Sequence, residues 1–470
     1  MSLQSALSIT GSGLAAVQRQ ISIVSQNVAN ASTTGYVREV AVQISLEAGS
    51  QPSGVAVGPT QRALDAPLQA SVLGQNATVS GLQTSAAALA AIDAAQGTTG
   101  TDGTSLATLA GGLQTAFTTL RGNPSSTPQQ QAVVGAAQAL AGGINALSQA
   151  YAGQRQAAQD SLVQQVGVAN QVLGQIGAIS TQIISLKGQG ASTADLENQR
   201  DEQLASLSNL VSVHATVSAS GDMSITLDDG TQLPTRALSG PLATKDPTIA
   251  PGDTYVKGDP ATAIPAITLG GQDVTGSLAG GSIGANIALR DTTLPSYQKT
   301  LDTYSTTLAT RFSGQGLDLF TNGGASVPAS ATDVIGLSAT IQVNAAVVAN
   351  PTLVRDGTSG TGGTATGTTA VIDAVLNKTF ATQNGTPGLV SQAASLTAVQ
   401  SQDSSAASAA LTTQTGVQTS LNSQLDSKSG VSVDQELSNM VGLQNAYGAG
   451  GKIISALQSM FNTLLSAVNP

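Results

Sequence analysis

Apolar residues recur at every seventh position near the C-terminal end of the chain. The repeat falls on Val433, Met440, Tyr447, Ile454, Phe461 and Val468, and companions stand three residues after members of this line at Leu443, Leu457 and Leu464. Such a heptad pattern predicts a helix with a coiled-coil seam. An isolated amphipathic helix is marginal in water, so this helix needs a partner that covers its apolar stripe.

The N-terminal stretch has the same seven-residue step. Its main line is Leu7, Leu14, Ile21 and Val28, and its companion line is Leu3, Val17 and Val24. The simplest partner for the C-terminal helix is therefore the N-terminal helix of the same chain, with leftover apolar surface available to neighbouring copies. We predict packing of the main line against Met440, Tyr447, Ile454, Leu457, Phe461 and Leu464.

The N-terminal helix is expected to stop soon after Val28. Asn30 can close it, and Gly35 supplies a permissive turn before Tyr36. Alternating apolar residues then predict a strand within residues 37–57, followed by a loop rich in glycine and proline. From the residues alone, this Asn/Gly/Tyr cluster is a helix stop followed by a hairpin.

Residues 82–210 are helical in pattern almost throughout. Helices are predicted at residues 86–95, 106–120, 129–147 and 160–187, and the helical period returns at residues 295–312 and 389–425. The pattern favours an elongated antiparallel bundle. The densest cluster of charge includes Glu197, Arg200, Asp201 and Glu202, and we expect it to form the solvated face of a helix.

The expected fold is mainly α, with a smaller β-rich part that runs from residue 211 to about residue 278. It combines paired terminal coiled-coil helices with a helical bundle in an elongated multi-domain protein. We predict a terminal domain of residues 1–70 and 426–470, a bundle of residues 71–210, 285–320 and 371–425, a β-rich excursion of residues 211–284, and a loop-rich, outward-facing segment of residues 321–370. The last segment contains a low-complexity loop at residues 357–367.

Composition supports this picture and excludes several functions. Charged residues make up 9% of the 470 residues, against roughly 25% in an ordinary globular protein, which suits helices packed through small side chains. The net charge of −10 provides no basic surface, so we expect neither nucleic acid nor membrane as a partner. No apolar run approaches the ~18 residues of a membrane helix. The start of the chain does not resemble a secretory signal peptide, so we expect a soluble protein that is cytoplasmic or exported without a cleaved signal.

No arrangement of residues in the sequence predicts catalysis. The chain has no cysteine and one histidine, His214, which is expected on the solvent face of a strand. Asp228 and Asp229 precede a glycine in a turn, where aspartate is common for backbone reasons. Residues 448–452 lack the spacing and the preceding strand of a phosphate loop. We therefore expect a protein that is not an enzyme, with no catalytic, cofactor-binding or metal site.

Glycines interrupt both terminal helices, and their role has two possible explanations. Gly448, Gly450 and Gly451 each cost the last helix about 1 kcal/mol relative to alanine, and Gly11 and Gly13 do the same near the start. Either the ends become ordered only on incorporation into an assembly, or the glycines permit close helix approach within a stable monomer. The sequence leaves both explanations open.

Two strings at opposite ends of the chain resemble the terminal signatures of one protein family, the bacterial flagellar axial proteins, which include rod, hook and hook-associated subunits. The first is NVANASTTGY at residues 27–36, and the second starts at VSVDQELSNM and continues through QNAY, KII and MFNTLL. The charged helix at residues 196–210 and the hairpin pattern after it are similar to the hook-associated members rather than to rod or hook subunits.

The resemblance implies a secreted structural subunit that joins hook to filament in the flagellum. It implies export through the flagellar type III system, with an export chaperone at the C-terminal helix. The other partners would be further copies of the chain in a ring, the hook protein and a second junction protein. It also adds Asn27, Asn30, Gly35 and Tyr36 to the predicted assembly interface. The alternatives are a hook or rod subunit, or an exported adhesin or enzyme carried on an axial scaffold.

Overall fold

The computed structural model describes residues 3–33, 35–48, 51–97, 103–236, 240–259, 262–323, 326–328, 334–359, 367–383 and 385–468. The fold is mainly α with small antiparallel sheets, as the sequence predicts. The chain divides into two units, of which unit 1 comprises residues 1–79, 168–241 and 414–470, and unit 2 comprises residues 80–167 and 242–413. The four-part division predicted from sequence stays a prediction, and these units place their boundaries elsewhere.

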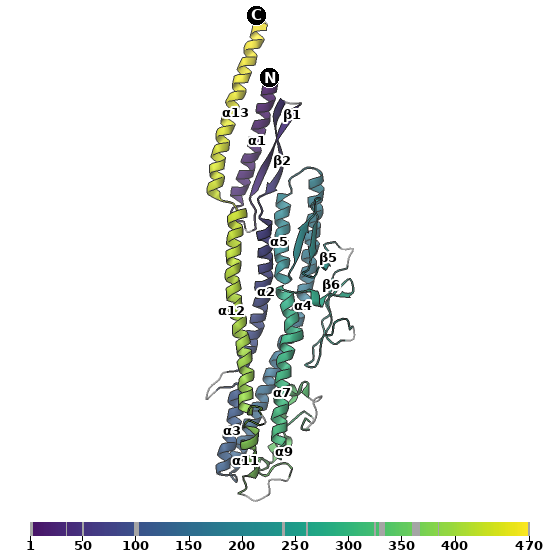
Figure 1. The fold of residues 1–470 in the computed structure, drawn as a ribbon, viewed down its shortest axis with the longest axis vertical. Coiled ribbons are helices and arrows are strands. Elements are labelled where there is room, and N and C mark those ends of the chain that lie inside the picture. The colour runs from purple at the N-terminus through teal and green to yellow at the C-terminus, as the bar shows by residue number, and fades with distance from the viewer. Residues whose placement is uncertain are drawn as a thin grey trace. The chain divides into compact units, whose positions relative to one another are not determined.

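Unit 1 contains both terminal helices and a hairpin. Its elements are α1 (Leu3–Ala29), β1 (Glu39–Ala48), β2 (Gln51–Arg62), α5 (Ala194–Leu210), β3 (His214–Val217), β4 (Met223–Thr226), β5 (Gln232–Leu233) and α13 (Val433–Val468). Three helices contribute residues to both units: α2 (Ala66–Ala95), α4 (Thr127–Gly188) and α12 (Leu389–Ser429). Helix α1 packs against α13 on one side and against the hairpin on the other (Figure 1). The predicted terminal helices and their pairing are therefore present.

The hairpin corrects one sequence prediction. A loop rich in glycine and proline is expected after the first strand, but Gln51–Arg62 form the twelve-residue strand β2, the second strand of the expected hairpin. Proline is tolerated in an edge strand, and both strands of a two-stranded sheet are edges. The antiparallel register shifts between Ala41 and Gln43 and between Leu46 and Glu47, and such bulges accommodate the irregular residues.

Unit 2 contains the principal apolar core. Its remaining helices are α3 (Leu106–Gly122), α6 (Gly281–Ala288), η3 (Leu289–Thr293), α7 (Leu294–Ser313), α8 (Leu337–Thr340), α9 (Ala345–Ala349), α10 (Leu353–Asp356), α11 (Ala370–Ala374) and η5 (Val375–Thr379), with the short helix η2 (Thr275–Ser277). Its strands are β6 (Leu242–Ala243), β7 (Thr268–Leu269), β8 (Gln272–Asp273), β9 (Phe320–Thr321) and β10 (Gln342–Val343). Phe312 lies among Phe117, Phe320 and Phe380, so a cluster of aromatic rings forms part of this core.

Several predicted boundaries change in the structure. The helices expected at residues 129–147 and 160–187 are parts of one helix, α4, of 62 residues. Its buried stripe continues through Tyr151, Arg155 and Gln159, and an apolar pattern does not identify the arginine and the glutamine as core. The β-rich excursion has only strands of two to four residues. Part of the predicted low-complexity loop, residues 360–366, lies outside the described residues.

Candidate assembly surface

The signature at residues 27–36 builds the connection from α1 to β1. The side chain of Asn27 is buried and donates from Nδ2 to the carbonyl of Glu39 at 2.9 Å. Its Oδ1 accepts from the amide of Glu39 at 2.9 Å and from the hydroxyl of Tyr36 at 3.0 Å. Gly35 has a φ of 79°, a conformation that glycine adopts without strain. The Asn/Gly/Tyr cluster therefore holds a helix-to-strand connector together.

Asn30 contributes at the end of α1, where the sequence predicts a helix stop. The helix ends at Ala29, and the Nδ2 atom of Asn30 donates back to the carbonyl of Gln26 at 3.1 Å. The four signature residues thus shape the connector. Within the part of the chain that the structure describes, the hydrogen bonds of these side chains stay within the connector and the end of α1.

The pairing of α1 with α13 is antiparallel, because Gln18 lies near Tyr447 and Leu14 near Gly450. Gln18 Nε2 donates to the hydroxyl of Tyr447 at 3.2 Å. A Cβ atom built on Gly450 would lie 2.6 Å from Leu14 Cδ1, so the absence of a side chain lets the two helices approach closely. Half-buried seam positions are Leu14, Ile21, Val28, Met440, Ile454 and Leu457.

The remaining predicted seam positions are exposed in a single copy of the chain. Leu7, Tyr447, Phe461 and Leu464 are exposed by 43%, 39%, 56% and 56%. We use the name terminal apolar surface for these four and for the other large exposed apolar residues of α13 and the hairpin, which are Ile44, Leu46, Val433, Leu437, Val441, Ile453, Met460 and Leu465. These residues lie on α1 and on both elements that flank it, and exposed apolar residues in such numbers mark interaction sites.

The base of α13 is fixed by contacts that the sequence did not predict. Arg38 Nε lies 2.6 Å from Glu436 Oε1, and Glu436 is only 1% exposed. The amide of Arg38 donates to the carbonyl of Ser429 at 2.8 Å, and the amide of Asp65 donates to the Ser429 hydroxyl at 3.0 Å. The Arg38 contacts tie the connector to the junction of α12 and α13, and the Asp65 contact ties the residues before α2 to the same junction.

The charged helix α5 is not the solvated face that the sequence predicts. Arg200 is buried, and its Nη1 donates to the carbonyl of Gly221 at 2.7 Å. Arg62 of β2 forms ion pairs with Glu197 at 3.0 Å and with Asp201 at 2.7 Å. Burial lowers the pKa of Arg200. The β3–β4 turn and the hairpin therefore cover much of this face, and the charges join elements of unit 1.

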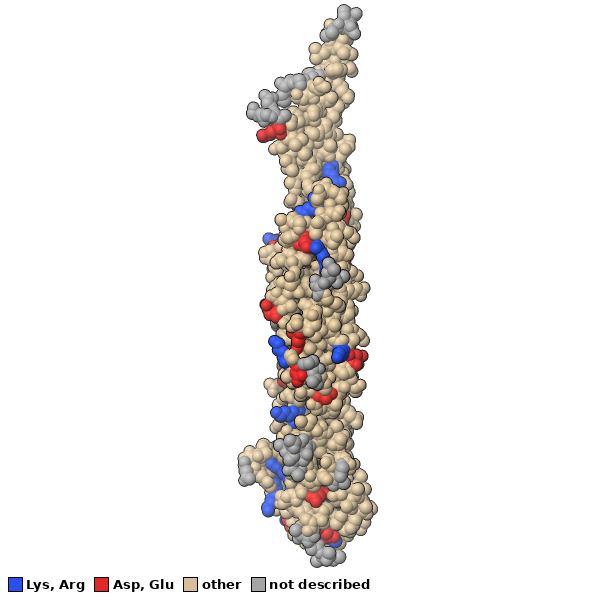
Figure 2. Space-filling model, turned by 90° about the vertical axis from the view of Figure 1, so that its right-hand side faces the viewer, with Lys and Arg blue, Asp and Glu red and all other residues tan. Residues whose placement is uncertain are grey.

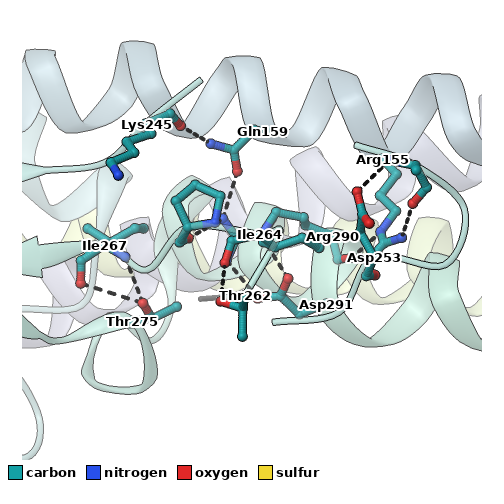
Figure 3. A network of polar contacts seen from close by, with 12 residues as sticks. Arg155, Gln159, Lys245, Asp253, Thr262, Ile264, Ile267, Thr275, Arg290 and Asp291 are labelled. Atoms are coloured by element: carbon teal, nitrogen blue, oxygen red, sulfur yellow. Dashed lines mark hydrogen bonds and ion pairs between the residues drawn. The ribbon is translucent and has the colours of Figure 1, made fainter. Parts of the chain in front are cut away.

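A second buried arginine network lies in unit 2 (Figure 3). Arg290 of η3 is fully buried and forms an ion pair with Asp291 at 2.7 Å, while its Nη1 donates to Gln159 Oε1 at 2.7 Å. Arg155 donates from Nε to the carbonyl of Arg290 at 2.7 Å and from Nη1 to that of Ala250 at 3.3 Å. The network joins α4 to η3 and to the segment before β7, which gives it a structural role.

The other candidate sites lack the geometry of catalysis. His214 is exposed, as predicted, and its Nε2 lies 3.0 Å from Asp228 Oδ1. Residues 448–452 lie within α13, so they form no phosphate loop. In the described part of the chain, no group of acidic and histidine side chains could hold a metal ion. None of the helices described there is both long and apolar enough to span a membrane.

Charged side chains are sparse and scattered on the face drawn in Figure 2, where they form no basic patch. This distribution agrees with the low content of charged residues, 9%, and the net charge of −10. Uncharged residues therefore supply most of this face.

Comparisons with known proteins point to one family. Residues 92–327, just over half of the chain, match the family described as the flagellar hook-associated protein FlgK helical domain. Residues 7–36 match the flagella basal body rod protein family, and residues 423–467 match the C-terminal family of flagellar basal body rod FlgEFG proteins. The two terminal matches include the strings in which the sequence resemblance was found.

Individual relatives that match the chain are hook-associated proteins as well. The chain is 29% identical over 251 residues to flagellar hook-associated protein 1 of Salmonella typhimurium, a match that covers 50% of this chain and 44% of the relative. It is 26% identical over 315 residues to flagellar hook-associated protein 1 of Escherichia coli, which covers 65% of this chain and 55% of the relative. The chain thus matches about half the length of these relatives. The solved structure of the flagellar hook junction protein FlgK from Burkholderia pseudomallei is 24% identical, with a TM-score of 0.45 over 56% of this chain and 46% of that chain.

Proposed function

The chain belongs to the flagellar hook-associated protein FlgK family, and from this membership we propose that it is a structural subunit of the bacterial flagellum that joins the hook to the filament. The observation that supports an assembly role is the terminal apolar surface. Burial of apolar area drives most protein association, and a single copy of the chain leaves Phe461, Leu464 and Leu465 more than half exposed.

The proposed partners follow from the same membership. They are further copies of the chain in a ring, the hook protein on one side and a second junction protein on the other, with an export chaperone on α13 before assembly. The proposed interface comprises the seam of α1 and α13 together with the terminal apolar surface. The connector residues support it indirectly, because Asn27 and Tyr36 position the hairpin beside α1.

We further propose that α13 is completed on assembly. Gly450 packs closely on Leu14, which explains that one glycine by close helix approach. A Cβ atom at Gly448 or Gly451 would meet nothing within 4 Å, so each weakens the helix by about 1 kcal/mol without a packing gain in one copy. A helix with this composition and an exposed stripe gains order when a neighbouring subunit covers it.

Deletion of residues 433–470 in the native bacterium tests the proposed function. We expect loss of filaments, with filament subunits shed into the medium. The double substitution Phe461→Ala and Leu464→Ala is a milder variant that keeps the helix, and it should weaken filament attachment. The matched control is Val217→Ala, which truncates an exposed apolar residue on strand β3 and should leave filaments unchanged. Normal filaments after the deletion would overturn the proposal.

A further inference from the structure

Glu39 occupies an unusual position at the start of β1. Its backbone forms two hydrogen bonds with the Asn27 side chain, and its own side chain is only 4% exposed. Its Oε1 has no hydrogen-bond partner among the residues that the structure describes. A buried carboxylate with an unsatisfied oxygen is costly, because it loses water without gaining a donor.

The charges around Glu39 do not offset this cost. Arg62, the cross-strand partner of Glu39, is already engaged by Glu197 and Asp201 of α5 at 3.0 and 2.7 Å. Arg19 on α1 is exposed, so solvent screens its attraction. The groups that act on Glu39 are Asp195 and Glu197 from α5, Arg62 from β2 and Arg19 from α1, and the Tyr36 hydroxyl of the connector is influenced by Glu39 in turn.

We propose that the folded connector holds Glu39 as a neutral carboxylic acid, and that ionisation of this group loosens the packing of β1 against α1. The connector then responds to pH: it becomes less stable as the pH rises from mildly acidic values to neutrality, and the loss levels off above neutrality. This property belongs to the free chain and goes beyond the proposed junction role. Failure of either hypothesis would leave the other intact.

The direction follows from proton linkage. Burial, with a further contribution from Asp195, raises the pKa of Glu39 from 4.5 to about 7. The folded state therefore keeps a proton that the unfolded state releases between these two values. The resulting stability is fully present below the unfolded pKa and is lost as the pH rises through the folded pKa.

Hydrogen exchange on the full-length chain tests the proposal through the amides of Arg38, Glu39 and Ala63, which form hydrogen bonds at the connector. Protection factors, corrected for intrinsic exchange, are measured from about pH 5 to about pH 8. For the wild type we expect protection to fall by up to about tenfold per pH unit below pH 7. Glu39→Gln should remove most of this slope and give higher protection than the wild type above neutrality.

Glu47→Gln is the matched control, because Glu47 lies on the same strand but is exposed. This variant should follow the wild-type profile. Equal pH profiles for the wild type and Glu39→Gln would overturn the proposal.

A direct titration keeps the proposal testable even if Glu39→Gln fails to fold. The carboxyl carbons of the wild-type chain are labelled with ¹³C-glutamate and followed by NMR as a function of pH. We expect one glutamate to titrate near pH 7, and for this signal to be absent from any soluble Glu39 variant. Titration of every glutamate near the ordinary value of about 4.3 would contradict it.

Discussion

The phenylalanines of the two units lie in opposite environments. In unit 2, the Phe312 ring lies 5.8 Å from Phe117, 5.4 Å from Phe320 and 5.8 Å from Phe380, measured between centroids, and none of these residues is more than 6% exposed. In unit 1, Phe461 of α13 is 56% exposed. Unit 2 closes its core within one chain, whereas the seam of unit 1 remains open.

The comparison shows that the same type of apolar residue has two different roles: it stabilises the fold where it is buried, and it contributes to association where it is exposed. A buried ring stabilises the fold that surrounds it, because its removal leaves a cavity. An exposed ring on a heptad stripe contributes little to the free chain but contributes apolar area to an association. The two units should therefore respond differently to equivalent substitutions.

The largest effect is expected from Phe312→Ala. Truncation at the centre of the aromatic cluster should lower the free energy of unfolding of unit 2 by about 3–5 kcal/mol. Urea unfolding followed by far-UV circular dichroism measures this loss. Phe461→Ala is the matched substitution in unit 1. It should change the free energy of unfolding of unit 1 by less than about 0.5 kcal/mol. Equal losses in the two variants would remove the contrast between the units.

A medium effect is expected at the base of α13. Arg38→Met leaves the buried Glu436 without its cation and should destabilise unit 1 by about 2 kcal/mol. The double variant with Glu436→Met removes both charges and should lose less than the single variant, because no unpaired carboxylate remains. Hydrogen exchange of the first turns of α13 reports the change. An additive double variant would mean that the 2.6 Å contact contributes no coupling.

The smallest effect is expected at the glycines of α13. Gly448→Ala meets open space and should stabilise the helix by up to about 1 kcal/mol through its intrinsic propensity. Gly450→Ala should gain less, because its new Cβ atom lies 2.6 Å from Leu14 Cδ1 and must displace that side chain. Thermal unfolding of the two variants gives the comparison. A larger gain at Gly450 than at Gly448 would argue against close packing at that position.

Sequence reasoning predicts those helices in which apolar residues recur with a regular local period. The heptads identify α1 and α13, and the weak helical pattern from residue 389 identifies α12, which ends at Ser429 rather than at residue 425. The sequence predicts a hairpin but misses the extent of strand β2, because Pro52, Gly54, Gly58 and Pro59 usually break regular structure. Their tolerance depends on an edge position and bulges, which only the paired strand reveals.

Long-range polar contacts are the other part that sequence reasoning misses. Arg38 and Glu436 are 398 positions apart, and no local pattern connects them. Arg200 carries a charge typical of a solvated helix face, but a carbonyl from the β3–β4 turn takes the place of water. The seam residues could be listed from sequence, yet the structure alone separates half-buried Leu14 and Ile454 from exposed Phe461 and Leu464.

The central claim is that a single copy of the chain leaves the apolar stripe of α13 partly exposed, and that α13 becomes fully ordered when neighbouring subunits cover this stripe on assembly. Hydrogen exchange of α13 in the free full-length chain tests it most directly, with α7 (Leu294–Ser313) as the internal reference. We expect the amides of residues 453–465 to exchange near their unprotected rates while α7 stays protected, and to become protected in the assembled state. Strong protection across residues 453–465 in the free chain, comparable with that of α7, would contradict the claim.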